Sequence, residues 1–100
     1  DAVIVATPHY DHPRLVMDAF RHGLHAITEK PAGVYTAAVR EMNEAAKKSG
    51  KLFGIMYNQR TNPLYAKVKE LLASGEMGEI KRVVWQITNW YRSQSYYNSG

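Results

Sequence analysis

The sequence predicts an α/β protein: a partial doubly wound parallel sheet with flanking helices, followed by a final strand that belongs to a second α/β sheet. Short apolar runs rich in β-branched residues recur along the chain, and stretches with apolar residues at helical spacing separate them. Glycine and proline stand at the boundaries between these segments. The predicted order is β-α-β-α-β-α-β, and such alternation indicates parallel strands joined by right-handed crossovers.

Clear start and stop signals mark the first strand and the first helix. Residues 2–6 form a continuous apolar run, which is typical of a strand buried on both faces. Asp11 or His12 can cap the helix that follows, and Pro13 suits its first turn. Gly23 stands where a helix can end in a C-terminal cap.

The same signals predict two further pairs of a strand and a helix. Residues 24–28 form the second strand candidate, and Thr36 and Gly50 bound the helix after it. Residues 52–57 form the third strand candidate. Residues 62–75 then carry an asparagine cap, a proline in the first turn and a terminal glycine, which predict another helix.

The pattern changes between residues 80 and 90, where side chains alternate between two unlike faces. This alternation predicts a strand of a different sheet. We therefore divide the chain into residues 1–62, with the alternating strands and helices, and residues 63–100, with a further helix and a strand of another sheet.

Composition narrows the classes of function. The formal net charge is +4, but the basic residues are spread out, so the sequence lacks the clustered basic face that nucleic-acid binding requires. No apolar run approaches the ~20 residues that span a bilayer. The absence of cysteine excludes disulfides and thiolate metal sites, and it agrees with a cytoplasmic protein.

Polar residues gather where the three predicted parallel strands end. The clusters are residues 7–12, residues 29–31 and residues 58–60, whereas the loops at the opposite edge are plainer. Ligands of open parallel sheets bind outside the carboxyl ends of the strands. The sequence therefore predicts a ligand site at this edge.

Lys30 has a clear chemical use at such an edge. Interconversion of an alcohol and a ketone needs hydride transfer together with proton transfer at the oxygen, and lysine can carry the proton when its surroundings favour the neutral form. Pro31 fixes the backbone beside Lys30, and Glu29 could hold the lysine or bind a cofactor. A solvent-exposed loop lysine is the alternative, and composition alone favours it.

Two other groups of residues allow more than one interpretation. His9, Asp11 and His12 could hold a metal, but this spacing without a third fixed ligand is a weak signal, and we predict no metal. His12 stands at a helix N-terminus, a place that favours phosphate groups. Trp90 and Tyr91 suit either a sugar-binding or interface surface or plain packing.

In this order and spacing, four segments resemble one family. They are residues 1–8 (DAVIVATP), His12, residues 29–31 (EKP) and residues 75–80 (GEMGEI). The chain resembles the Gfo/Idh/MocA oxidoreductases, which pair an N-terminal Rossmann-type domain with a C-terminal α/β domain. The resemblance implies that residues 1–62 are the C-terminal half of the dinucleotide-binding domain, and that residues 63–100 are a linking helix and the first strand of the C-terminal substrate and oligomerisation domain. The resemblance implies an NAD- or NADP-dependent dehydrogenase acting on a sugar, cyclitol or similar polyol, with Lys30 as the catalytic residue in proton transfer.

The resemblance also implies the binding residues. Those expected to contact NAD or NADP are Thr7, Pro8, His9, His12, Glu29, Lys30, Pro31, Asn58 and Gln59. Those expected to contact the sugar-like substrate are Lys30, Arg60, Trp90 and Tyr91. The sequence contains neither a glycine-rich phosphate loop nor the acidic residue that reads the ribose, so it does not separate NAD from NADP.

These gaps lead us to expect a fragment of a longer homo-oligomeric enzyme. As an isolated chain it is expected to be inactive, to bind dinucleotide weakly or not at all, and to self-associate through exposed strand edges. A non-catalytic sensor of the same fold is the alternative function. A receiver-like module is a third, although the acidic cluster that it would need is reduced to Asp11 and Glu29.

Overall fold

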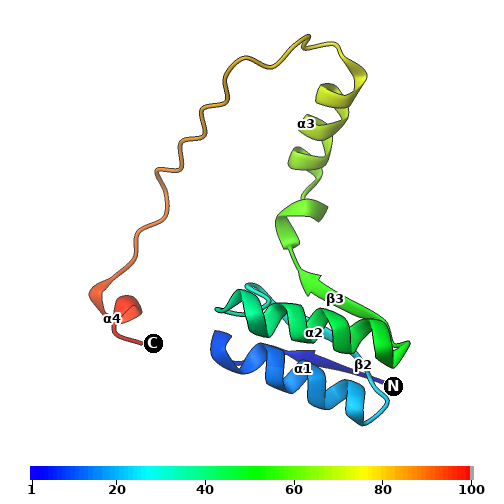
Figure 1. Cartoon of the computed structure of the whole chain (residues 1–100). Helices are drawn as coiled ribbons and strands as arrows, with labels where there is room; N and C mark the ends of the chain where they lie inside the picture. The colour runs from blue at the N-terminus through cyan, green and yellow to red at the C-terminus, as the bar shows by residue number, and fades with distance from the viewer. Residues whose placement is uncertain (100) are drawn as a thin grey trace. The chain divides into compact units, whose positions relative to one another are not determined.

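The computed structural model describes residues 1–99 (Figure 1). Its contacts divide the chain into two units, Asp1–Asn58 and Gln59–Gly100, which are described separately below. No helix among the described residues is both long and apolar enough to cross a membrane. The assignment of residues 1–62 and 63–100 to two domains of a longer protein stays a prediction.

The first unit is built on a parallel sheet of three strands in the order β1-β2-β3. The strands are β1 (Ala2–Val5), β2 (His25–Glu29) and β3 (Phe53–Met56), each within one or two residues of its predicted bounds. Val5 lies opposite Thr28 in β2. Glu29 in turn lies opposite Met56. All three strands therefore end at the same edge, which confirms the predicted α/β class.

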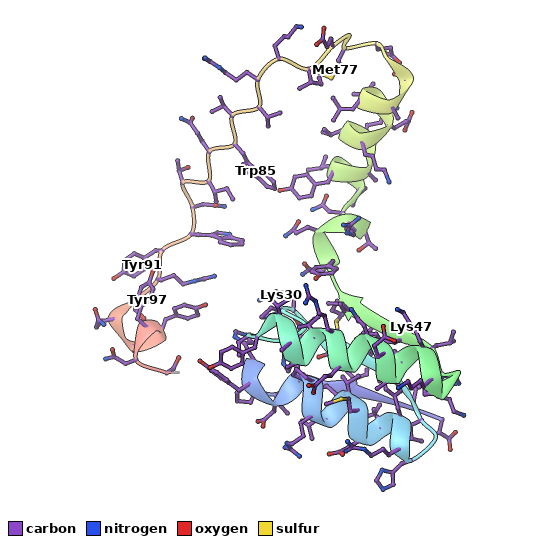
Figure 2. The ribbon with its side chains drawn as sticks, viewed as in Figure 1. Lys30, Lys47, Met77, Trp85, Tyr91 and Tyr97 are labelled. Atoms are coloured by element: carbon purple, nitrogen blue, oxygen red, sulfur yellow. The ribbon has the colours of Figure 1, made fainter. Side chains whose placement is uncertain are left out.

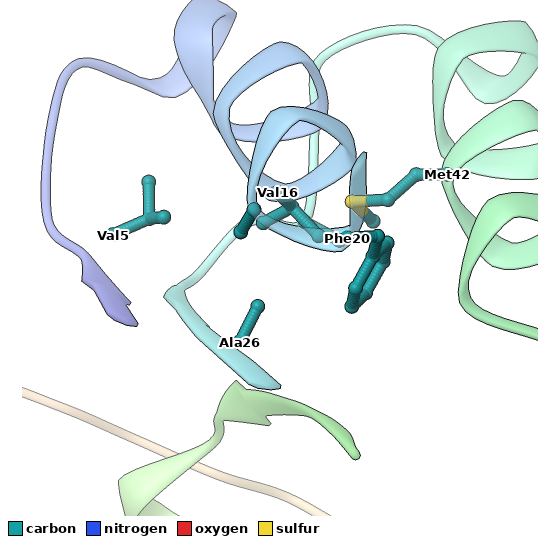
Figure 3. Close-up of a cluster of buried hydrophobic side chains, with 7 residues drawn as sticks. Val5, Val16, Phe20, Ala26 and Met42 are labelled. Atoms are coloured by element: carbon teal, nitrogen blue, oxygen red, sulfur yellow. The ribbon is translucent and has the colours of Figure 1, made fainter. Parts of the chain in front are cut away.

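Two helices cover one face of this sheet, α1 (His12–Arg21) and α2 (Thr36–Ser49). Both connections cross the sheet in the same direction, so right-handed crossovers place both helices on the same side, where they pack against each other (Figure 1). The buried core lies between the helices and the sheet (Figure 3). Its members are Val5, Val16, Ala19, Phe20, Ala26, Ala32 and Met42.

Glycines end the helices of the first unit as the sequence predicts. Gly23 and Gly50 have φ values of 71° and 65°, in the left-handed region that a residue without a side chain enters at low cost. Asp11 is the N-cap of α1, although its side chain makes no capping hydrogen bond. The N-cap of α2 is Tyr35, and Thr36 is the first helical residue. The predicted cap at Thr36 is therefore wrong by one position.

No helix of the first unit covers the opposite face of the sheet. Ile4, Ile27 and Gly54 form one row across the three strands on this face. Ile4 is 66% exposed, and Leu52, just before β3, is 75% exposed. The prediction that residues 2–6 are buried on both faces is therefore wrong for this chain, because α1 and α2 both lie on the other side.

The second unit contains α3 (Pro63–Ser74) and a short helix, α4 (Gln94–Tyr97). A 3-10 turn, Asn58–Thr61, precedes α3. The predicted cap of α3 is confirmed, because the Asn62 side chain accepts a hydrogen bond of 2.9 Å from the backbone N–H of Leu64. Gly75, with a φ of 80°, ends α3.

The strand predicted between residues 80 and 90 does not form. This segment is extended in Figure 1, but it belongs to no sheet in the part of the chain that the structure describes. A strand exists only when its backbone groups pair with a neighbour, and residues 59–99 supply no such neighbour. The Trp85 ring instead lies near the Tyr65 ring of α3, with 5.5 Å between the ring centroids.

Candidate functional site

The candidate site lies at the edge where β1 and β2 end. A loop with a short 3-10 turn, His9–Asp11, joins β1 to α1, and a second loop joins β2 to α2. Because β1 and β2 are hydrogen-bonded neighbours, the two loops start side by side. The sequence placed Thr7, Pro8 and His9 on the first loop and Lys30 and Pro31 on the second, and the structure brings all of them to this edge.

His12, the first residue of α1, contacts both loops from the interior of the protein. The whole residue is buried, with 0% of its surface exposed. Its Nε2 lies 2.8 Å from the carbonyl oxygen of Thr7. Its Nδ1 lies 2.7 Å from the carbonyl oxygen of Pro31. The ring is therefore within hydrogen-bond distance of both loops, and it offers no surface of its own to a ligand.

Glu29 and Lys30 stand at the end of β2. The backbone N–H of Lys30 donates a 3.1 Å hydrogen bond to Oε2 of Glu29, which orients the carboxylate. Thr28, just before them, is fully buried, and its hydroxyl donates to the Glu29 carbonyl oxygen at 3.3 Å. Lys30 itself is exposed, and Figure 2 shows its side chain projecting from the loop. The structure therefore presents an exposed lysine side chain next to a carboxylate that accepts a backbone hydrogen bond.

The residues that follow Lys30 in this loop pack against the core and against α1. Ala32 belongs to the buried core, and the Lys30–Pro31 peptide bond is cis. A side-chain carbon added to Gly33 would lie 2.8 Å from Cγ of Pro13 and 3.0 Å from Cγ2 of Val39. Only a residue without a side chain fits there, so the loop lies directly against the first turn of α1.

Aromatic rings line the exposed rim of the two loops. Tyr10 of the first loop and Tyr35 at the end of the second lie edge to face, with 6.1 Å between centroids. The rings of His9 and His12 are similarly arranged at 5.7 Å. The two loops therefore touch at the exposed rim through Tyr10 and Tyr35 and beneath it through His12.

The third predicted cluster follows β3. Asn58 ends the first unit, whereas Gln59 and Arg60 belong to the second. Within the second unit, an open hollow of about 360 Å³ is lined by Gln59, Arg60, Tyr65, Ala66, Lys69 and Trp85. Trp90 and Tyr91, elsewhere in the second unit, are also exposed, and the Arg92 guanidinium lies 5.2 Å from the centre of a Trp90 ring. The substrate contacts expected of these residues stay predictions.

Sequence reasoning found the loops but missed what holds them. His12 was expected to contact the cofactor, and its burial instead gives it a place beneath the loops. The contact between Gly33 and Pro13 was not anticipated. The available signal was a glycine two residues after Pro31, which is the kind of residue that close packing demands. Among residues 1–99, no three metal-ligating side chains come together.

The fold and the site agree with a family assignment. The model of the oxidoreductase family with an NAD-binding Rossmann fold, Gfo/Idh/MocA, matches residues 1–57. The chain belongs to this family, which confirms the resemblance seen in its motifs. The cofactor class of the family, NAD or NADP, agrees with the prediction.

Individual relatives show the range of the family. The chain is 36% identical to D-xylose 1-dehydrogenase (NADP(+)) of Hypocrea jecorina over 84% of its length and 22% of the relative. It is 29% identical to scyllo-inositol 2-dehydrogenase (NAD(+)) of Bacillus subtilis over 79% of its length and 23% of the relative.

A solved structure gives the same picture of the fold. An inositol dehydrogenase homolog of Azotobacter vinelandii, complexed with NADH and myo-inositol, superposes with a TM-score of 0.74 at 32% identity. The match covers 79% of this chain and 21% of that one. The chain thus spans less than a quarter of the relatives that it matches.

Proposed function

We propose that this chain forms the nicotinamide side of the active site in an NAD(P)-dependent dehydrogenase of sugars, cyclitols or similar polyols. One observation carries the proposal: Lys30 projects from a packed loop at the carboxyl edge of the sheet, directly after an oriented glutamate. The relatives named for xylose and inositol dehydrogenation support the substrate class.

The residues at the edge fit the polar groups of a nicotinamide ribose. Glu29 uses one oxygen to accept from the Lys30 N–H, and a carboxylate can accept about four hydrogen bonds, so capacity remains for ribose hydroxyls. Thr7 and Pro8 are exposed at the end of β1, and Asn58 is exposed after β3. We assign these residues to cofactor binding, together with His9, Pro31 and Gln59.

The proposed reaction divides the work between the cofactor and the lysine. A bound NAD(P)⁺ would supply the acceptor for the hydride of the carbinol carbon. We assign to the Lys30 side chain the acceptance of the hydroxyl proton as the C=O double bond forms, so the alcohol loses one hydride and one proton in total. The packed loop fixes the backbone from which the Lys30 side chain projects, which reduces the conformational freedom lost on reaching the transition state.

Removal of the lysine amine from the full-length protein tests the proposal. Lys30→Met keeps the length of the side chain but removes the amine, and we expect kcat to fall by about 10²- to 10⁴-fold. Lys51→Met is the matched control, because Lys51 precedes β3 at the opposite edge of the sheet. The assay is the absorbance of the reduced cofactor with myo-inositol, scyllo-inositol and D-xylose as substrates.

The outcomes separate three interpretations. Loss of turnover in Lys30→Met alone supports the proposal. Equal rates in both variants contradict a catalytic role for Lys30. Tight cofactor binding by the wild type, with no turnover of any polyol, supports the non-catalytic sensor instead. We also propose that the isolated chain is inactive and that the whole enzyme is a cytoplasmic homo-oligomer.

A further inference from the structure

We propose that His12 is a positioning residue that holds the two ligand-facing loops at a fixed separation and thereby places Lys30. This inference rests on the proposed function for its kinetic consequence. The structural part stands on geometry alone, since the ring lies within hydrogen-bond distance of Thr7 in one loop and Pro31 in the other.

The first step is the shape of the contact. The two ring nitrogens of His12 point in different directions, and each meets one backbone carbonyl oxygen, at 2.7 and 2.8 Å. Backbone carbonyls buried away from water need a donor, and an unmet one is costly. A rigid ring with one nitrogen facing each carbonyl spans the two loops, and the tautomer decides which nitrogen donates its N–H to a carbonyl oxygen.

The second step is the position of the contact relative to the proposed catalytic groups. Pro31 directly follows Lys30, and Thr7 is two residues beyond the end of β1. A shift of the Pro31 carbonyl therefore moves the Lys30 backbone with it. Misplacement of a reacting group by about 1 Å can lower the reaction rate by about 100-fold. Loss of the contact between His12 and the Pro31 carbonyl should therefore slow catalysis.

The third step separates His12 from ligand binding. The ring is fully buried under the loops, so it acts on a ligand only through them. Among the titratable groups, the His9 ring lies 5.7 Å from the His12 ring. Asp11 lies on the same turn, with its carboxylate paired to Arg14 at 3.5 Å. The role assigned to His12 is therefore to hold backbone, in contrast to the direct cofactor contact expected from the sequence.

Three variants of the full-length protein test the role. His12→Phe keeps a ring of similar volume and removes both nitrogens. His12→Gln supplies one amide, which can restore one of the two contacts. Val16→Ala is the control, since Val16 is equally buried in the same helix and belongs to the apolar core. Hydrogen exchange of residues 6–12 and 29–35 is measured without cofactor, and kcat and KM are measured with it.

We expect His12→Phe to speed exchange in both loops by about tenfold, as loss of a buried hydrogen bond would. Val16→Ala should leave the exchange of both loops within about twofold of wild type despite its core cavity. His12→Gln should protect one loop and expose the other. In the kinetic assay, His12→Phe should lower kcat by about 100-fold, whereas Val16→Ala should not.

Several results would overturn the inference. Unchanged exchange in either loop of His12→Phe would show that the ring does not hold both. Equal loosening by Val16→Ala would reduce His12 to an ordinary core residue. If His12→Phe does not fold, the comparison of His12→Gln with Val16→Ala decides by the same criteria. If the wild type neither binds nor turns over cofactor, the proposed function fails, and the exchange results still decide the role of His12.

Discussion

Gly33 shows how closely the loop after β2 is fitted to the first turn of α1. A methyl group at this position would lie 2.8 Å from the Pro13 ring, closer than side-chain carbons approach other atoms in proteins. The Pro13 ring is rigid and buried, so it has little room to yield. The backbone of the loop would have to move instead, and Lys30 belongs to that backbone.

We therefore predict that Gly33→Ala destabilises the protein by about 1–3 kcal/mol, the usual cost of overpacking a buried contact. Gly54→Ala is the matched control, because its added carbon would meet Ile27 at an ordinary 3.6 Å. The midpoint of urea unfolding should fall for Gly33→Ala only. Equal midpoints for the two variants would mean that the loop absorbs the methyl group without strain.

At this scale the sequence identified the exposed residues better than the buried ones. Lys30 and Glu29 could be placed at a strand end because a strand pattern precedes them and Pro31 follows. The contact between His12 and Pro31 joins residues 19 positions apart in the sequence. The contact between Gly33 and Pro13 joins residues 20 positions apart. Such contacts depend on tertiary packing, which local patterns in a single sequence do not record.

The end of α2 shows how a helix orders its surface charges. Lys47 and Lys48 stand in its last turn, where the partial negative charge of the helix end favours cations. Lys47 also donates a 2.7 Å hydrogen bond to Glu44 one turn earlier. This hydrogen bond and the charge of Lys47 lower the pKa of Glu44 from its ordinary value of 4.5, and Lys48 adds a smaller effect.

We predict that Lys47→Ala raises the pKa of Glu44 toward 4.5 and that Lys48→Ala raises it less, since only Lys47 makes the hydrogen bond. Because the folded-state pKa is lowered, the pair stabilises α2 above the ordinary carboxyl pKa, and this contribution is lost as the pH falls through the folded value. NMR titration of the Glu44 carboxyl carbon measures the shift. Equal shifts in both variants would contradict the assignment.

At the scale of elements, helices were predicted more accurately than the last strand. Caps and glycine stops are local signals, and they placed α1, α2 and α3 within one or two residues. The alternating pattern of residues 80–90 is equally clear, but a strand also needs a neighbour to pair with. That requirement lies outside the segment itself, so the pattern did not suffice.

At the scale of the whole molecule, the first unit leaves apolar surface uncovered. None of its helices lies on the face of the sheet that carries Ile4, and β1 forms an edge of this sheet with unpaired backbone groups. Fold class and family could be read from alternation and motifs, because these are distributed along the chain. The sequence did not reveal that this face is left without helices, because both helices of the first unit lie on the other side of the sheet.

We predict that the isolated 100-residue chain self-associates through this face and the β1 edge. Exposed apolar strand edges pair with other chains, and Ile4 is 66% exposed at the centre of the edge strand. Ile4→Lys should therefore shift the chain toward the monomer in sedimentation velocity at high concentration. Tyr35→Lys is the control, because Tyr35 is similarly exposed, at 64%, but lies on the loop between β2 and α2. This control substitution should leave the self-association unchanged. A monomeric wild type, or equal dissociation by both lysines, would show that this face does not hold the copies together.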